Sequence, residues 1–174
     1  MKYEDTTFMV LLNKYGKKRI LNSLDFRFAF ILSIVFAGFA IYSGLEVSLL
    51  KTTSPIFATV GSGMIAIVIA ALAIIVSMSD NDFVSLLKDS KIYDEILFIF
   101  WYVSILAGLS IFIDVLSTIF TTISVNAFFS AALLFITTFI TAYSVFAVVQ
   151  AIGTVMRYGL YRGEFIRLNK SKKG

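Results

Sequence analysis

Long runs of apolar residues, separated by short polar segments, dominate the chain. A helix needs about 20 apolar residues to cross the hydrocarbon core of a bilayer. The runs that approach or exceed this length cover approximately residues 28–45, 56–78, 96–120 and 127–156. They predict an all-α integral membrane protein, folded as a four-helix bundle. The last run is long enough that its helix should extend past the bilayer or tilt within it.

Local signals mark where these helices should begin and end. Ser54 followed by Pro55 is typical of an N-cap and a first helical position, so the second helix is expected to begin there. The polar residues 79–82 end that run, and they could cap a short helix over 83–88 within the loop 79–95. The uncharged segment 119–126 is expected to form a tight turn between the last two helices.

The distribution of basic residues predicts the orientation in the membrane. Fourteen of the 15 Lys and Arg residues lie in or beside the segments 1–27, 79–95 and 157–174, and only Lys51 lies on the other side. Cytoplasmic loops carry the excess of Lys and Arg, so both termini are expected in the cytoplasm of a cell that holds the protein in its inner or plasma membrane. A cleaved signal peptide is the competing interpretation of the first run. The long charged segment before it and the length of the run disfavour that interpretation.

The N-terminal segment 1–26 is amphipathic and basic. Its apolar residues follow helical spacing, so we expect a helix that lies on anionic headgroups, gates the bundle from below, or docks a soluble protein. With the basic C-terminal tail 157–174 it would form a cytoplasmic basic face, for which the candidates are Lys17, Lys18, Arg19, Arg157 and Arg162. Such a face could bind a cytoplasmic protein or a phosphate-bearing ligand.

Composition narrows the possible chemistry. The chain is 59% apolar and contains neither Cys nor His, so it has no disulfide, no thiolate zinc site and no imidazole base. We therefore expect no catalytic residue, no metal and no cofactor. A membrane-embedded enzyme would have to use the acidic residues of the loop 79–95, which are more typical of helix caps and a solvated surface.

Small residues recur at helical spacing along the first two runs. In the second run, the alternate spacing of four and three follows the 3.5-residue period of left-handed helix packing. The candidate packing residues are Gly63, Ala66, Ala70 and Ala73 in the second run and Ala37 and Gly44 in the first. Such seams are expected to pack the four helices together. Alternatively, one of them could line a water path between subunits.

Polar residues form similar stripes, and one of them is acidic. The candidates for a pore lining or polar seam are Asp114, Thr118 and Thr121 in the third run, Thr137, Thr141, Ser144 and Gln150 in the fourth, and Glu46 after the first. A carboxylate within the hydrocarbon costs about 2.5 kcal/mol or more, so it normally faces a partner or a water-filled cavity. Asp114 could lie near the headgroups, form a polar contact inside the bundle, or serve as an ion-attracting ring or proton site. With Glu46 it could make an acidic vestibule in an oligomer.

The pattern as a whole predicts a small homo-oligomeric channel or pore-forming effector, gated from the cytoplasmic side. The alternative is a non-conducting anchor or sensor that recruits a cytoplasmic partner. The layout resembles small four-span membrane subunits generally, including the membrane effectors found beside bacterial defence genes.

Overall fold

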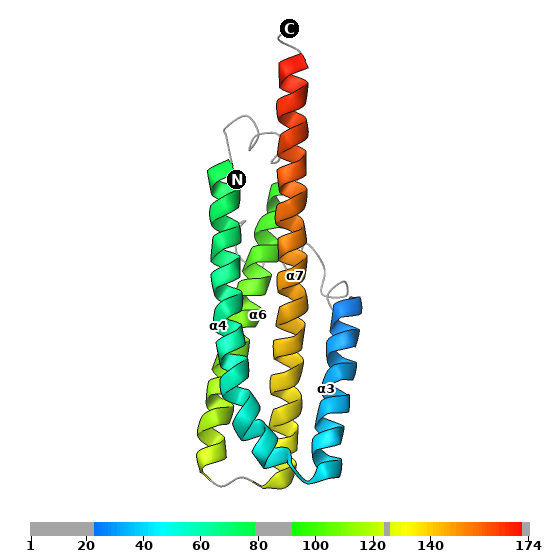
Figure 1. The fold of residues 1–174 in the computed structure, drawn as a ribbon, viewed down its shortest axis with the longest axis vertical. Helices are drawn as coiled ribbons and strands as arrows, with labels where there is room; N and C mark the ends of the chain where they lie inside the picture. Colours follow the sequence, from blue (N-terminus) through cyan, green and yellow to red (C-terminus); the bar gives the residue numbers. More distant parts are fainter. Residues whose placement is uncertain (1–22, 79–91, 124–125, 172–174) are drawn as a thin grey trace.

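The described part of the chain is entirely helical. The computed structural model describes residues 23–78, 92–123 and 126–171. In these ranges the chain forms four α-helices and no strand: α3 (Leu24–Ser43), α4 (Glu46–Met78), α6 (Ile92–Thr122) and α7 (Ala127–Ser171) (Figure 1). Each helix is long and apolar enough to cross a membrane, which confirms the predicted all-α class and its four membrane-length helices. The expected amphipathic helix up to residue 22 and the loop helix over 83–88 lie outside the described residues.

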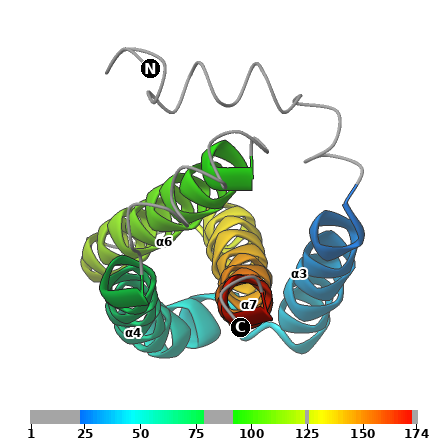
Figure 2. The ribbon, with the colours of Figure 1, turned by 90° about the horizontal axis from the view of Figure 1, so that it is seen from above.

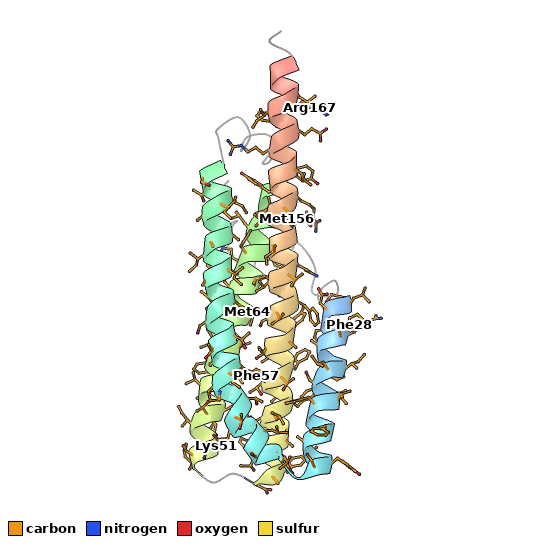
Figure 3. All side chains as sticks on the ribbon, in the orientation of Figure 1. Phe28, Lys51, Phe57, Met64, Met156 and Arg167 are labelled. Atoms are coloured by element: carbon orange, nitrogen blue, oxygen red, sulfur yellow. The ribbon has the colours of Figure 1, made fainter. Side chains whose placement is uncertain are left out.

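Successive helices run in opposite directions, and α7 lies between the others. Viewed along the bundle, α3 packs on one side of α7, while α4 and α6 pack on the other (Figure 2). α3 and α6 end, and α4 and α7 begin, at one end of the bundle, which we call the short-connection end (Figure 1). We call the opposite end, where α3 and α6 begin, the terminal end. There α7 continues beyond the other helices, and Arg167 lies on this extension (Figure 3).

Side-chain and glycine caps fix the two ends of α3. The Ser23 Oγ accepts a hydrogen bond of 3.2 Å from the Phe26 amide at the first turn. At the other end Gly44 adopts φ 65°, and the amides of Gly44 and Leu45 donate to the carbonyls of Ile41 and Ala40. Glycine reaches this left-handed conformation without a steric penalty. Gly44, expected as a packing residue, therefore ends the helix instead.

The second helix begins earlier than the sequence indicated. It starts at Glu46, so Pro55 lies inside α4 and Ser54 is a buried residue of the helix rather than its N-cap. A proline inside a helix removes the hydrogen bond to the carbonyl four residues before, here that of Lys51, and bends the helix. Figure 1 shows this bend between the cyan first turns of α4 and the remainder, and Figure 3 places Phe57 near it. Membrane helices tolerate such a break when neighbouring helices cover it.

The main apolar core lies between α4, α6 and α7. To this core α4 contributes the buried side chains Met64, Val68, Ala71 and Ile75, which pack with residues of the other two helices such as Val103 and Ala151. Gly61 of α4 is also buried, against Ile111 of α6. The expected packing residues Gly63, Ala66, Ala70 and Ala73 are exposed on a different face of α4. On α4, the residues that pack within the chain are therefore displaced by two positions in the sequence from the predicted packing residues.

Aromatic side chains attach α3 to α7. The ring of Phe26 meets those of Phe139 and Tyr143 edge to face, with centroids 5.2 and 5.6 Å apart. Phe30 contacts Phe135 in the same way at 5.7 Å. Edge-to-face contacts of this kind stabilise a pair by about 0.5–1.5 kcal/mol beyond the area they bury. Closer to the short-connection end, Ala37 is buried, as expected for a packing residue.

The contact at Gly61 gives a test of this packing. A Cβ atom on Gly61 would lie 2.6 Å from Ile111 Cγ1, whereas one on Gly63 would meet nothing within 4 Å. Gly61→Val should therefore destabilise the monomeric protein in detergent by about 1–3 kcal/mol more than Gly63→Val, because overpacking forces neighbouring side chains to move. Reversible denaturant unfolding followed by circular dichroism measures this difference. Equal stabilities would show that α4 does not pack through Gly61.

Candidate functional site

Many of the side chains buried inside the bundle are polar. Ten polar or acidic side chains are buried among the described residues: Ser33, Ser54, Ser110, Asp114, Ser117, Ser130, Thr137, Thr138, Thr141 and Ser144. Most come from α6 and α7, and Ser33 and Ser54 add one each from α3 and α4. The bundle therefore has a polar interior along the contact between α6 and α7, beside its apolar core.

Asp114 lies at the centre of this polar interior and is completely buried. Its Oδ2 accepts hydrogen bonds from Ser110 Oγ, one turn earlier on α6, at 3.1 Å, and from Thr141 Oγ1 of α7 at 3.4 Å. The two hydroxyl oxygens are themselves 2.9 Å apart. Three oxygen-bearing side chains from two helices thus meet at one point, and we call them the Asp114 cluster.

The position of the cluster along the helices places it well inside the bundle. Thr141 lies 14 residues after Ala127, the first residue of α7, which corresponds to about 21 Å of helix at ~1.5 Å per residue. Asp114 lies eight residues, or about 12 Å, before the end of α6 at Thr122. The structure shows Asp114 in a polar contact inside the bundle. Its depth in a membrane and its role as an ion or proton site stay predictions.

Several buried oxygens of this interior have no hydrogen-bond partner among the described residues. They are Ser54 Oγ, Asp114 Oδ1, Ser117 Oγ, Ser130 Oγ and Thr138 Oγ1. Buried polar atoms in native proteins nearly always have a partner, and leaving one without costs about 1–3 kcal/mol. These oxygens are therefore available to water molecules or to an ion, and Asp114 Oδ1 is the only carboxylate oxygen in this set.

The carboxyl group of Asp114 has no basic neighbour in the described interior. None of the Lys and Arg side chains whose burial the structure describes is buried, and Asp114 takes part in no ion pair among these residues. An ionised carboxylate in this environment is costly without a partner. A proton or a bound cation on Asp114 would remove that cost, and both are species that can move through a membrane.

The other hydroxyls of the predicted polar seam are mostly engaged within their own helices. Thr118 and Thr121 donate to the carbonyls of Asp114 and Thr118, and Thr137 and Ser144 donate to those of Leu134 and Ile140. Thr118 and Thr121 are half-buried, whereas Thr137 and Ser144 are buried. Of the predicted seam on the fourth helix, Thr141 is the residue that the structure joins to Asp114.

Glu46 and Gln150 lie away from the Asp114 cluster. Glu46 is the half-buried first residue of α4, at the short-connection end, so it does not share the depth of Asp114. Gln150 is exposed, and its Nε2 donates to Asp25 Oδ2 of α3 near the terminal end. The predicted acidic vestibule of Asp114 and Glu46 is therefore not formed within one chain.

Sequence reasoning missed a pocket at the terminal end. It has a volume of about 450 Å³ and is lined by α3, α6 and α7, together with Ser23 before α3. Among the residues that line it are Asp25, Tyr102 and Tyr143, and the hydroxyls of the two tyrosines are hydrogen-bonded to each other. The signal in the sequence that could point to it is Asp25, an acid in the first turn of an apolar helix.

The basic face is only partly described. Arg157 is exposed and lines the terminal-end pocket, and Arg162 is half-buried on the next turns of α7. Lys17, Lys18 and Arg19 lie outside the described residues. Within the described ranges, no group of three acidic side chains could hold a metal ion.

Comparison of the chain with protein-family models, curated proteins and solved structures gives no match. The site therefore has to be interpreted from its own geometry.

The Asp114 cluster predicts an energetic coupling between its members. Ser110→Ala and Asp114→Ala should each change stability, and together they should deviate from additivity by about 0.5–2 kcal/mol, because both remove the same hydrogen bond. Ser144→Ala is the matched control, since the Ser144 hydroxyl donates to a carbonyl of its own helix. Its effect should add to that of Asp114→Ala. A double-mutant cycle by unfolding in detergent measures both, and strict additivity for Ser110 would argue against the cluster.

Proposed function

We propose that this protein conducts protons or small monovalent cations across a cell membrane, along the polar interior of its own helix bundle. The observation that carries the proposal is the buried carboxyl of Asp114, which has two hydroxyl partners on Oδ2, none on Oδ1 and no basic neighbour in the described interior. Carboxylate and hydroxyl oxygens are the ligands that hard cations prefer, and a carboxyl group also exchanges protons.

The extent of the polar residues supports a path rather than an isolated site. Along α7 the buried polar residues extend from Ser130 to Ser144, which are 14 residues or about 21 Å apart. This length is about two thirds of the hydrocarbon core of a typical bilayer, which is about 30 Å thick. The unpartnered hydroxyls of Ser117 and Ser130 continue the interior from Asp114 towards the short-connection end.

The path is closed in the conformation described. Asp114 and its neighbours are completely buried, and the hydrogen-bonded pair Tyr102 and Tyr143 lies between the Asp114 cluster and the terminal end. Conduction would therefore require α6 and α7 to separate slightly. The basic asymmetry of the sequence supports an orientation with the terminal end in the cytoplasm, where the segment 1–26 would act as the gate.

The path lies within each subunit. The exposed row of small residues on α4 supports association between subunits. Gly63, Ala66, Ala70 and Ala73 form a continuous exposed row of small residues. Rows of this kind let helices of neighbouring subunits approach closely in a membrane. The homo-oligomer would then hold several bundles side by side, each with its own Asp114.

Flux measurements test the conducting role of Asp114. Purified protein in liposomes should dissipate an imposed gradient of H⁺, K⁺ or Na⁺, and Asp114→Asn should reduce the rate at least about tenfold, because the amide can neither release a proton nor neutralise a cation. Glu46→Gln, which changes an acid outside the polar interior, should leave the rate within about twofold of wild type. Separate gradients of H⁺, K⁺ and Na⁺ identify the ion.

Unchanged flux in Asp114→Asn would contradict the proposal. So would the absence of flux from the wild-type protein under every gradient at both signs of membrane potential, which would favour the non-conducting anchor instead.

The oligomer is tested by a pair of glycine variants. Gly63 and Gly38 are both exposed helical glycines with open space around the position of a Cβ, but Gly63 lies in the row of small residues on α4 and Gly38 lies on α3. Gly63→Ile should shift the protein towards monomer, because a branched side chain prevents close approach of the helices. Gly38→Ile should leave the mass unchanged. Light scattering in mild detergent measures the mass, and an oligomer that withstands Gly63→Ile must use a different face.

A further inference from the structure

The terminal-end pocket has the dimensions of a small-molecule site. Its volume of about 450 Å³ falls in the range of about 300–1,000 Å³ that such sites occupy. It is built by three helices rather than by one surface: Asp25 comes from α3, Glu95 and Tyr102 from α6, and Tyr143 and Gln150 from α7. Because these residues come from well-separated positions in the chain, the pocket depends on the packing of the bundle.

The walls of this pocket are aromatic. The lining includes Phe98, Tyr102, Tyr143, Tyr158 and Tyr161. Phe98 stacks on Tyr102 with ring centroids 5.9 Å apart, and Tyr102 meets Tyr143 at 6.2 Å and 79°. Packing and the hydrogen bond between the two tyrosine hydroxyls hold these rings in place. The faces of fixed aromatic rings attract cations, and they do so most strongly when water is excluded.

Beside these rings lies an acid that forms no ion pair with any described residue. Asp25 is half-buried, and Gln150 donates a hydrogen bond to its Oδ2 across the contact between α3 and α7. Among the described residues Asp25 forms no ion pair. Two other charged residues in the described part of the lining, Glu95 and Arg157, are exposed and opposite in sign. They offset each other and are screened by solvent, so Asp25 sets the charge of the inner part of the pocket.

We infer that the terminal-end pocket binds an organic ammonium ion, with Asp25 as its counter-ion and the rings of Tyr102 and Tyr143 against its alkyl groups. The combination of one carboxylate with several aromatic faces is the chemistry that recognises substituted ammonium groups. An anion is disfavoured, because two of the three charged residues in the described part of the lining are acids. The ligand could be a free ammonium compound or the ammonium headgroup of a phospholipid, and both present the same chemistry.

Binding of choline tests this inference directly. The full-length protein is reconstituted in phosphatidylglycerol nanodiscs, and choline binding is measured by isothermal titration calorimetry. The comparison ligand is 3,3-dimethylbutan-1-ol, in which a carbon atom replaces the charged nitrogen at nearly the same shape. Wild-type protein should bind choline at least about tenfold more tightly than this neutral alcohol, because only the cation interacts with Asp25 and the ring faces.

Variants assign the binding to the pocket. Asp25→Asn should weaken choline binding at least about tenfold, while Glu46→Gln, at the short-connection end, should leave it unchanged. Tyr102→Phe keeps the ring and should stay within about threefold of wild type, whereas Tyr102→Leu should lose most of the affinity. If Asp25→Asn fails to fold, the comparison of choline with its neutral analogue on the wild-type protein decides alone.

Choline affinity in nanodiscs of two lipid compositions distinguishes a phospholipid headgroup from a free ammonium compound as the ligand. If a phospholipid headgroup occupies the pocket, choline should bind at least about threefold more weakly in phosphatidylcholine nanodiscs, because the headgroup competes for the site. Equal affinity in both lipids would assign the pocket to a free ammonium compound. No choline binding, or equal affinity for choline and its neutral analogue, overturns the inference. Neither result bears on ion flux through Asp114, since that is measured in choline-free liposomes.

Discussion

The packing of three helices against α7 is the constraint on which the rest of the structure depends. α3 has its main contacts with α7, and α6 brings Ser110 and Asp114 to the same helix. One helix must therefore present different chemistry on its different faces: aromatic rings towards α3, hydroxyls towards α6 and small apolar residues towards α4. This division explains why polar and apolar residues alternate so closely along α7. It also explains why the sequence of α7 does not separate into one apolar face and one polar face.

The sequence allowed the number of helices and their approximate ends to be predicted, because long apolar runs have few alternatives to membrane-length helices. The predicted beginning of α4 was wrong. Ser54 and Pro55 carry the local signal of a helix start, but the tertiary contacts of a bundle can cover a proline within a membrane helix. Local propensity therefore gave way to packing at that point, and the helix extends nine residues further towards its N-terminus, to Glu46.

Which side of each helix faces inward was harder to predict. The small residues of α4 follow a regular period, yet Gly61, outside that row, makes the close contact with α6. Periodicity identifies a face suited to close approach but does not say which neighbour approaches it. Asp114 could be singled out because a buried acid is costly, whereas its partners Ser110 and Thr141 required the register of α6 on α7, which a single sequence does not contain. The same holds for the contact of Asp25 with Gln150, which are 125 residues apart.

The length of α7 has a mechanical consequence. It is one continuous helix of 45 residues, or about 67 Å, and it contains no proline that would let its two parts bend independently. α7 should therefore tilt or rotate as one rigid body, which includes both its protruding part and the part that carries Thr141. A soluble molecule that pushes on the protruding part would transmit that displacement to the hydrogen bond between Thr141 and Asp114, without first changing the conformation of any loop.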